Sequence, residues 1–409
     1  MTPTKTGPLA GVRVLDLTSV MMGPYCTQIL ADLGADVIKV ESPEGDVLRA
    51  LPPARTPGNS AIARWLLRGK RSVVLNLKTN EGRELLLDLA RQADVFIHSM
   101  RPQAIESLGL DYAAFRAVNA RLVYCNLYGF GRGGRYAGMA AYDDTIQAAC
   151  GLAMLQKEML GTPSYVASVV ADKICGLTGV YAVTSALLHR ERTGHGQEVD
   201  VPMFETMTSF VLVEHLAGAV YTQDQGPPVY RRAVSPSRRP YATQDGFISV
   251  LVYNDKQWKA FAQLVGKPAL ATDPRFASLS DRSRNVDEWC AAVAAELTRL
   301  TTDEWLDQLS RAGVPAMRLN TTEDLLTDPH LQDVNFFVEV EDPQDGRLRM
   351  PRPPVIFSDA PCQVSEGGPA LDADTDAVLA HLGLSAERIR GLRERGAIGA
   401  ARAVPAQSE

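Results

Sequence analysis

Asp172 is the residue whose surroundings most suggest chemistry. It interrupts a small, apolar stretch, VVADKICG (169–176), at the start of the most apolar predicted helix. A carboxylate there has two interpretations. It caps the helix and complements its dipole, or it is a reactive group in a confined site, where water is removed while nearby N–H groups still position it. The local sequence alone favours the cap.

Basic residues recur at strand ends and adjacent turns of the amino-terminal part of the chain. They are Lys39, Lys70, Arg71, Lys78 and Arg101. Single charges at such positions are ordinarily solvated. Ligands of parallel sheets bind at the carboxyl ends of the strands, and Lys and Arg there bind phosphate groups. Their repetition at one kind of position therefore favours a polyphosphate ligand.

The first strand-to-helix turn, TSVMMGP (18–24), has a glycine and a proline at the helix start. Such a turn directs backbone N–H groups at a phosphate or carboxylate. It lacks the GxGxxG spacing of dinucleotide-binding proteins. Taken alone, a plain tight turn is the simpler interpretation.

The elements that position these residues alternate along the chain. The segments 11–17 and 36–40 are rich in β-formers and flank a helical segment, 24–33. The pattern continues with strands at 72–76, 94–98 and 122–127 and a helix at 81–92. Strands that alternate with helices predict an α/β fold, with a Rossmann-like, mostly parallel sheet covered on both faces.

The remainder of the chain predicts a discontinuous large lobe and a smaller one. A long helix over 166–192 ends at a glycine-containing stop. Residues 223–239 are rich in Pro, Gly and Arg and predict a linker. Residues 240–334 form the small α+β lobe, and 335–409 return to the large lobe of 1–222.

Composition excludes several functional classes. The 42 basic and 48 acidic residues give a net charge of -6, so no global field favours nucleic acid or an anionic membrane. The six cysteines and six histidines are dispersed, which predicts neither a metal site nor a disulfide framework. No segment has the apolar length of a signal peptide or a membrane span. A reducing cytoplasm is the expected location.

A set of motifs follows in order along the chain. They are GVRVLDL (11–17), Gly23-Pro24, LGADVIKVE (33–41), Gly45-Asp46 with Arg49, KRS (70–72), Asp94-Val95 with Arg101-Pro102, Tyr142-Asp143, Asp172, GHGQ (194–197), Asp245-Gly246, GVPA (313–316) and Asp328-Pro329. In these motifs the chain resembles the family III CoA transferases, a group that includes formyl-CoA transferase, carnitine CoA-transferase and α-methylacyl-CoA racemase.

The resemblance implies that Asp172 is the nucleophile. In this family the aspartate attacks an acyl-CoA thioester to give an acyl-aspartyl anhydride, and the CoA thiolate then forms an aspartyl-CoA thioester. The acceptor acid reverses these steps. Each intermediate stays activated if water is excluded. No metal and no cofactor beyond CoA as a substrate are expected.

The resemblance also implies the residues that contact CoA in the large lobe. They are Val20, Met21, Lys39, Leu77, Lys78, Ser99, Met100, Arg101 and Tyr142. Many members read Glu-Asn-Phe-Arg-Pro-Gly where this chain reads HSMRPQ (98–103), so Arg101 is the strongest of these positions, as a phosphate contact. The glycine run with which formyl-CoA transferase closes its site is missing between 225 and 260, and 235–239 is a candidate replacement.

Tyr142 separates the two chemistries of the family. The racemase branch has a histidine at this position as one of its two bases, and tyrosine, with a pKa of about 10, is a poor base near neutral pH. The sequence therefore predicts a CoA transferase. The alternatives are an α-methylacyl-CoA racemase-like epimerase and a non-catalytic CoA-binding subunit.

The substrates are less defined by sequence than the reaction. The partners are an acyl-CoA and a carboxylic acid, with succinyl-CoA as the favoured donor and a small dicarboxylate or hydroxy acid as the acceptor. Linker residues Arg231, Arg232, Arg238 and Arg239 either bind the acceptor's second carboxylate or form a solvated basic surface. The resemblance further implies an interlocked homodimer.

Overall fold

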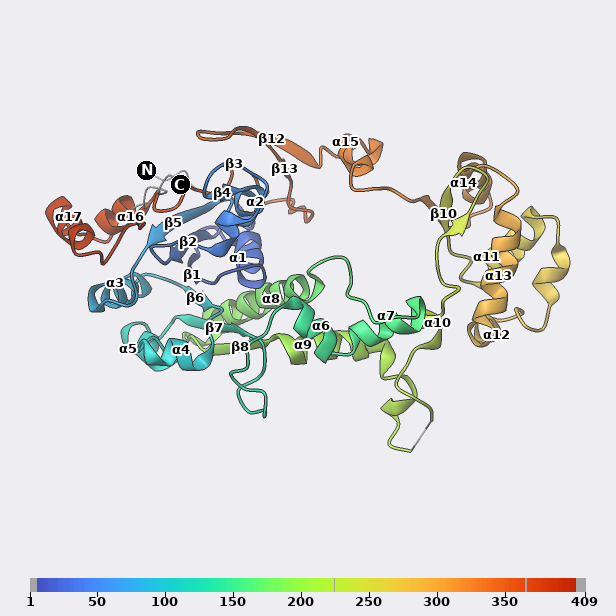
Figure 1. Cartoon of the computed structure of the whole chain (residues 1–409), viewed down its shortest axis with the longest axis horizontal. Helices are drawn as coiled ribbons and strands as arrows, with labels where there is room; N and C mark the ends of the chain where they lie inside the picture. Colours follow the sequence, from blue (N-terminus) through green and yellow to red (C-terminus); the bar gives the residue numbers. More distant parts are fainter. Residues whose placement is uncertain (1–5, 224, 365, 402–409) are drawn as a thin grey trace, which may run out of the picture. The chain divides into compact units, whose positions relative to one another are not determined.

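The computed structural model describes residues 6–223, 225–364 and 366–401. These residues form two compact units (Figure 1). The first unit takes the residues up to Cys150, Ala167–Thr208 and those from Asp333 onward. The second takes Gly151–Val166 and Ser209–Gln332, and thus includes the segment 223–239 that the sequence suggests as a linker.

A six-stranded parallel sheet forms the centre of the first unit, in the order β5-β2-β1-β6-β7-β8. The strands are β1 (Arg13–Leu17), β2 (Asp36–Glu41), β5 (Lys70–Val74), β6 (Val95–His98), β7 (Val123–Tyr128) and β8 (Glu198–Pro202). All six residues of β7 are buried, as expected for a strand covered on both faces. The predicted α/β fold with a mostly parallel sheet is confirmed.

Helices cover both faces of this sheet. A large apolar core joins the strands to α3 (Asn80–Ala90), α5 (Tyr112–Val118), α16 (Thr375–His381) and α17 (Ala386–Glu394), so the carboxy-terminal helices pack with amino-terminal ones (Figure 1). The short helix α4 (Pro102–Ser107) begins at a proline, which suits the first helical position.

Helices α1 (Met22–Asp32) and α8 (Val170–Thr193) pack against each other at two glycines. A Cβ atom on Gly176 would lie 2.8 Å from the carbonyl oxygen of Met22, and one on Gly179 would lie 2.9 Å from Sγ of Cys26. The glycines that interrupt the apolar sequence of α8 therefore mark where its backbone closely approaches α1.

A small hairpin docks beside the main sheet. Strands β12 (Phe337–Asp342) and β13 (Gly346–Pro351) pair antiparallel with each other. Arg64, on α2 (Ala61–Leu66), forms ion pairs of 3.0 Å with Asp342 and 2.6 Å with Asp345. The short strands β3 (Ala54–Thr56) and β4 (Asn59–Ser60) precede α2.

The second unit has its own core. Its antiparallel sheet has the order β11-β10-β9, and Trp258, Trp289 and Trp305 lie buried among its helices. Its strands are β9 (Tyr241–Ala242), β10 (Phe247–Val250) and β11 (Ala316–Arg318), and its helices include α7 (Leu152–Leu160), α10 (Arg231–Val234), α11 (Asp255–Leu264), α12 (Leu279–Arg284), α13 (Val286–Leu297) and α14 (Thr302–Arg311).

Three α-helices of the described residues remain. Helix α6 (Asp143–Ala149) belongs to the first unit, whereas α9 (Met203–His215) and α15 (Pro329–Asp333) continue from one unit into the other. Within the described ranges, no helix combines the length and apolar character needed to cross a membrane.

Candidate active site

A cavity of about 180 Å³ lies at the carboxyl edge of the parallel sheet in the first unit. Parallel sheets bind their ligands at this edge. The walls come from the segments that follow four neighbouring strands: 19–22 after β1, Ser99 with Arg101 and Pro102 after β6, 127–130 at the end of β7, and Met203 after β8. Residues 138–142 and Asp172 complete the lining.

Asp172 is the third residue of α8, and its side chain does not cap that helix. The N-cap position is Val169, which provides no side-chain cap. The backbone N–H of Asp172 instead donates to Oδ1 of Asp143 at 3.0 Å. The interpretation of Asp172 as the cap is therefore wrong, because the cap position is Val169. As an acidic residue of the first turn Asp172 still complements the helix dipole, and its side chain lines the cavity.

The pKa of Asp172 is raised to about 7, first by burial and second by the negative charge of Asp143. Asp143 is itself buried, and its Oδ2 accepts a hydrogen bond of 2.5 Å from Nε2 of Gln147. Both oxygens of Asp143 are thus held, whereas Asp172 is the carboxylate that reaches the cavity. Near neutral pH a substantial fraction of Asp172 is ionised although it is half-buried.

The first turn of the sheet forms another wall. Gly23 lies so close to Thr18 that a Cβ atom on the glycine would be 2.2 Å from that of Thr18. No side chain caps the start of α1, where Met21 and Met22 line the cavity. The amino end of this 11-residue helix therefore presents its partial positive charge to the site.

Six of the sequence-predicted site residues meet at this cavity. They are Val20, Met21, Ser99, Arg101, Tyr142 and Asp172. Tyr142 is 66% exposed and precedes α6, where its backbone N–H donates to Oγ1 of Thr145 at 2.9 Å. Within the described part of the chain, neither Arg101 nor Lys78 forms an ion pair, so both cations stay available to an anionic ligand.

The other four predicted contacts do not line the cavity. Leu77 and Met100 pack against the large apolar core, and Lys78 lies exposed beside them in sequence. Lys39 is 1% exposed, and its Nζ lies 3.1 Å from Oδ2 of Asp46. Contact between these residues and CoA stays a prediction.

Most of the basic positions are paired inside the protein. Lys70 is buried and forms a 3.1 Å ion pair with Asp16, while Arg71 lies 2.6 Å from Asp36. Both residues begin β5 and therefore lie at its amino end, away from the ligand-binding edge. The interpretation of the whole basic set as one phosphate-binding group is wrong, since buried aspartates are the partners of Lys39 and Lys70.

His98 has a structural role. It is fully buried at the end of β6, with Nε2 at 2.8 Å from Oδ1 of Asn126 and Nδ1 accepting a 3.2 Å bond from the N–H of Met100. Burial lowers the pKa of His98 to about 4, so the ring is neutral at pH 7. It fixes the turn that carries Ser99 and Arg101.

Sequence reasoning missed part of the cavity wall. Phe130 and residues 138–141 line the cavity although no motif marked them. Asp143 was visible in the Tyr142-Asp143 motif, but only tertiary structure shows its contact with α8. The signal that was available is the acidic pair directly after Tyr142.

The comparisons with known proteins agree with this arrangement. Residues 9–375 match the family described as CoA-transferase family III. The chain is 34% identical over 390 residues to a succinate–glutarate CoA-transferase of Agrobacterium fabrum, covering 93% of this chain and 97% of that protein. It is 32% identical over 390 residues to a succinyl-CoA:mesaconate CoA-transferase of Haloarcula marismortui, covering 92% and 97%.

A solved structure shows the same fold. The crystal structure of a CaiB/BaiF family protein from Brucella suis superposes with a TM-score of 0.77 and 33% sequence identity, covering 92% of this chain and all of that one. The sheet, the cavity at its carboxyl edge and the family match lead to one assignment: this chain belongs to CoA-transferase family III and is a CoA-transferase.

Proposed function

We propose that this enzyme transfers CoA from a succinyl-type donor to a small dicarboxylic or hydroxy acid, with Asp172 as the covalent carrier. One observation carries the proposal: Asp172 lines the cavity half-buried, while its helix-capping role is taken by Asp143. A desolvated carboxylate with a raised pKa is a stronger nucleophile than a solvated one.

The proposed route conserves atoms and charge. An oxygen of ionised Asp172 attacks the thioester carbonyl, the C–S bond breaks, and CoA leaves as a thiolate. The thiolate then attacks the Asp172 carbonyl of the anhydride, which releases the donor acid and leaves an aspartyl-CoA thioester. The acceptor acid reverses both steps. No cofactor beyond CoA takes part.

The walls of the cavity suit this route. The uncapped amino end of α1 offers N–H groups to a developing oxyanion or a phosphate. Arg101, which has no acidic partner among the described residues, is the proposed phosphate contact. Val20, Met21, Ser99 and Tyr142 are proposed to bind the pantetheine part of CoA.

The acceptor is proposed to carry a second anionic group. The names of the relatives, which include glutarate and mesaconate, support a dicarboxylate. Arg232, Arg238 and Arg239 line a cavity of about 350 Å³ within the second unit. That these arginines bind a carboxylate stays a prediction from the sequence.

A trapping experiment tests the covalent step. The enzyme is incubated with succinyl-CoA, quenched with hydroxylamine and digested, and the peptide that carries Asp172 is examined by mass spectrometry. We expect a hydroxamate at Asp172 in the wild type and none in Asp172→Asn. An unmodified Asp172 peptide, or full turnover by Asp172→Asn, would overturn the proposal.

The epimerase alternative makes a different prediction. Among the described residues that line the cavity there is no histidine, and Asp143 has both oxygens in hydrogen bonds. These facts favour transfer over α-proton exchange. Incubation of a 2-methylacyl-CoA in D₂O separates them, because an epimerase introduces deuterium at the α-carbon without an acceptor acid. A non-catalytic subunit would show neither exchange nor transfer.

We also propose that the enzyme is a homodimer, which for this family is expected to be interlocked. Helix α8 exposes Leu177, Tyr181 and Leu188 at 50%, 63% and 53%. Their spacing of four and seven residues places them on one side of the helix. A large exposed apolar stripe on one element is typical of a protein interface. Light scattering after gel filtration should give twice the chain mass.

A further inference from the structure

Val20 has a backbone conformation that its residue type disfavours. Its φ is 67°, in the left-handed region, where a β-branched side chain crowds the following carbonyl. Val20 also lines the active-site cavity. Such outliers persist only where the surroundings fix them, so the question is which groups hold this turn.

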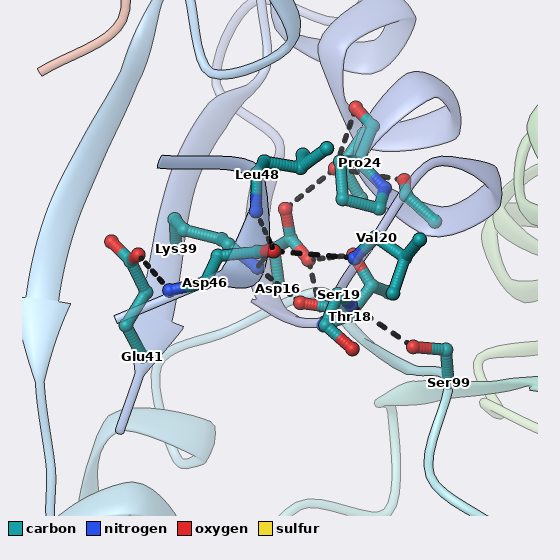
Figure 2. A network of polar contacts seen from close by, with 12 residues as sticks. Asp16, Thr18, Ser19, Val20, Pro24, Lys39, Glu41, Asp46, Leu48 and Ser99 are labelled. Atoms are coloured by element: carbon teal, nitrogen blue, oxygen red, sulfur yellow. Dashed lines mark hydrogen bonds and ion pairs between the residues drawn. The ribbon is translucent and has the colours of Figure 1, made fainter. Parts of the chain in front are cut away.

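Two successive peptide groups of the turn have specific partners (Figure 2). The N–H of Ser19 donates to Oγ of Ser99 at 3.0 Å, and the N–H of Val20 donates to Oδ1 of Asp46 at 3.3 Å. The carbonyl oxygen of Thr18 accepts a hydrogen bond from Nζ of Lys39. Loops after β2 and β6 thus bind the turn after β1.

Asp46 links this turn to the rest of the protein. Its Oδ1 also accepts the N–H of Leu48 at 3.1 Å and so caps the short helix Val47–Ala50, while its Oδ2 pairs with Lys39 at 3.1 Å. The backbone N–H of Asp46 donates to Oε1 of Glu41 at 3.0 Å. Figure 2 shows Asp46 between Lys39, Leu48 and Val20. One carboxylate therefore sets the position of three segments.

The charges around Asp46 balance. Asp16, Lys39, Asp46 and Lys70 are all at least 90% buried, and they provide two negative and two positive charges. Asp16 pairs with Lys70 at 3.1 Å, and its Oδ1 accepts the N–H and Oγ1–H of Thr18 at 2.9 and 2.6 Å. Loss of one charge would leave its buried partner uncompensated. The network therefore has little freedom to rearrange.

From these contacts we infer that Asp46 is a positioning residue for the transfer reaction: it holds Val20 in the left-handed conformation and so keeps the turn 19–22 in the cavity wall that Asp172 shares. The inference rests on the proposed role of Asp172. Lys39 acts through Asp46 and through the Thr18 carbonyl. It is therefore required for the position of the turn whether or not it contacts CoA.

A double-mutant cycle tests the inference, with Asp46→Ala, Val20→Gly and the double variant. Alanine removes the oxygen that accepts the Val20 N–H, and glycine at position 20 adopts positive φ without steric cost. If Asp46 holds Val20 against strain, Asp46→Ala should lower the rate of Asp172 trapping by about 10- to 100-fold in the Val20 enzyme. In the Val20→Gly background the same substitution should lower the trapping rate by a factor that is less than about a third as large. An equal fold-decrease in the trapping rate in both backgrounds would overturn the inference.

A second pair of variants avoids the buried charges. Val20→Pro fixes φ near −65° and removes the N–H that Asp46 binds, whereas Val20→Gly keeps both the N–H and the left-handed conformation. We expect Val20→Pro to trap acyl groups at least about tenfold more slowly than Val20→Gly at equal melting temperature. Equal trapping rates would sink the inference even if Asp46→Ala fails to fold.

The outcomes separate the inference from the proposed function. If the wild type itself forms no adduct at Asp172, the proposed function falls, and the cycle is then assessed on kcat/KM for CoA transfer. If the wild type forms the adduct but the cycle is additive, only the role of Asp46 falls.

Discussion

The backbone N–H of Asp172 donates to the carboxylate of Asp143 at 3.0 Å, so the two acidic residues interact through one backbone group while their side chains keep separate tasks. Asp143 satisfies the start of α8 and raises the pKa of its neighbour. Asp172 is left to face the cavity as a carboxylate that is easily protonated.

The first prediction concerns pH. If ionised Asp172 is the nucleophile, transfer should rise with pH and reach half of its maximum near pH 7. Asp143→Asn keeps an acceptor for the Asp172 N–H but removes the negative charge, so the pKa of Asp172 should fall. The ratio of kcat at pH 6 to that at pH 8 should rise about two- to fivefold. An unchanged profile would show that another group titrates.

The second prediction concerns stability. The pKa of Asp172 is about 7 in the native state, whereas the pKa of an aspartate in the unfolded chain is about 3.9. Between these values the native state binds more protons, so stability falls as the pH rises through the window. Asp172→Asn should therefore exceed the wild type in unfolding free energy by up to about 4 kcal/mol at pH 8.

Urea unfolding at two pH values measures this difference. The advantage of Asp172→Asn should shrink at pH 5, where the native wild-type side chain is already neutral. An advantage of the same size at both pH values would mean that the charge of Asp172 is not its cause. The variant should be inactive at both.

The third prediction concerns Arg101. A guanidinium that meets a phosphate contributes about 1.5–3 kcal/mol, so Arg101→Gln should raise the KM for succinyl-CoA about 10- to 100-fold and change kcat little. Added salt should reduce the difference between the variant and the wild type. The exposed Arg116 on α5 provides the matched control, Arg116→Gln, whose KM should equal that of the wild type. An equal KM for Arg101→Gln would remove Arg101 from the CoA site.

The fourth prediction concerns the approach of α8 to α1. A methyl group at Gly176 would lie 2.8 Å from the Met22 carbonyl oxygen, so Gly176→Ala should lower stability by about 1–3 kcal/mol. It should also slow Asp172 trapping, because both helices contribute to the cavity wall. Gly133 has open space around its Cβ position and provides the control, Gly133→Ala. Similar stabilities for the two variants would contradict the tight contact.

The fifth prediction concerns assembly. If Leu177, Tyr181 and Leu188 are covered by a second copy, Tyr181→Asp combined with Leu188→Asp should shift the gel-filtration mass from dimer to monomer, because two charges would be buried without partners. Arg116→Asp, on an exposed site of another helix, should leave the mass unchanged. A dimer in both variants would place the interface elsewhere.

The sequence predicts most of the sheet because its strands are short apolar runs bounded by turn residues. The expected strand 11–17 is found at Arg13–Leu17, and the expected 94–98 at Val95–His98. The expected strand 72–76 is found two residues earlier, at Lys70–Val74. Lys70 begins the strand despite its charge, because Asp16 on β1 neutralises it inside the protein.

The site is predicted less completely, for a physical reason. The apolar runs and turn residues that predict strands are local features of the sequence. The partners of Asp172 and Lys39 are instead set by tertiary contacts. The sequence shows that Lys39 is basic and that it lies near the end of a strand. Whether it meets solvent, a ligand or Asp46 depends on which loop lies over it.

The contact between α1 and α8 also bears on how such an enzyme can change its substrate. Helices α1 and α8, which both contribute to the cavity wall, touch at Gly176 and Gly179 of α8. A longer side chain at either glycine would separate the two helices. This leaves that part of the wall nearly invariant in shape. New acceptor acids are therefore more readily accommodated by changes in the segment 138–142, which lines the cavity outside this helix contact.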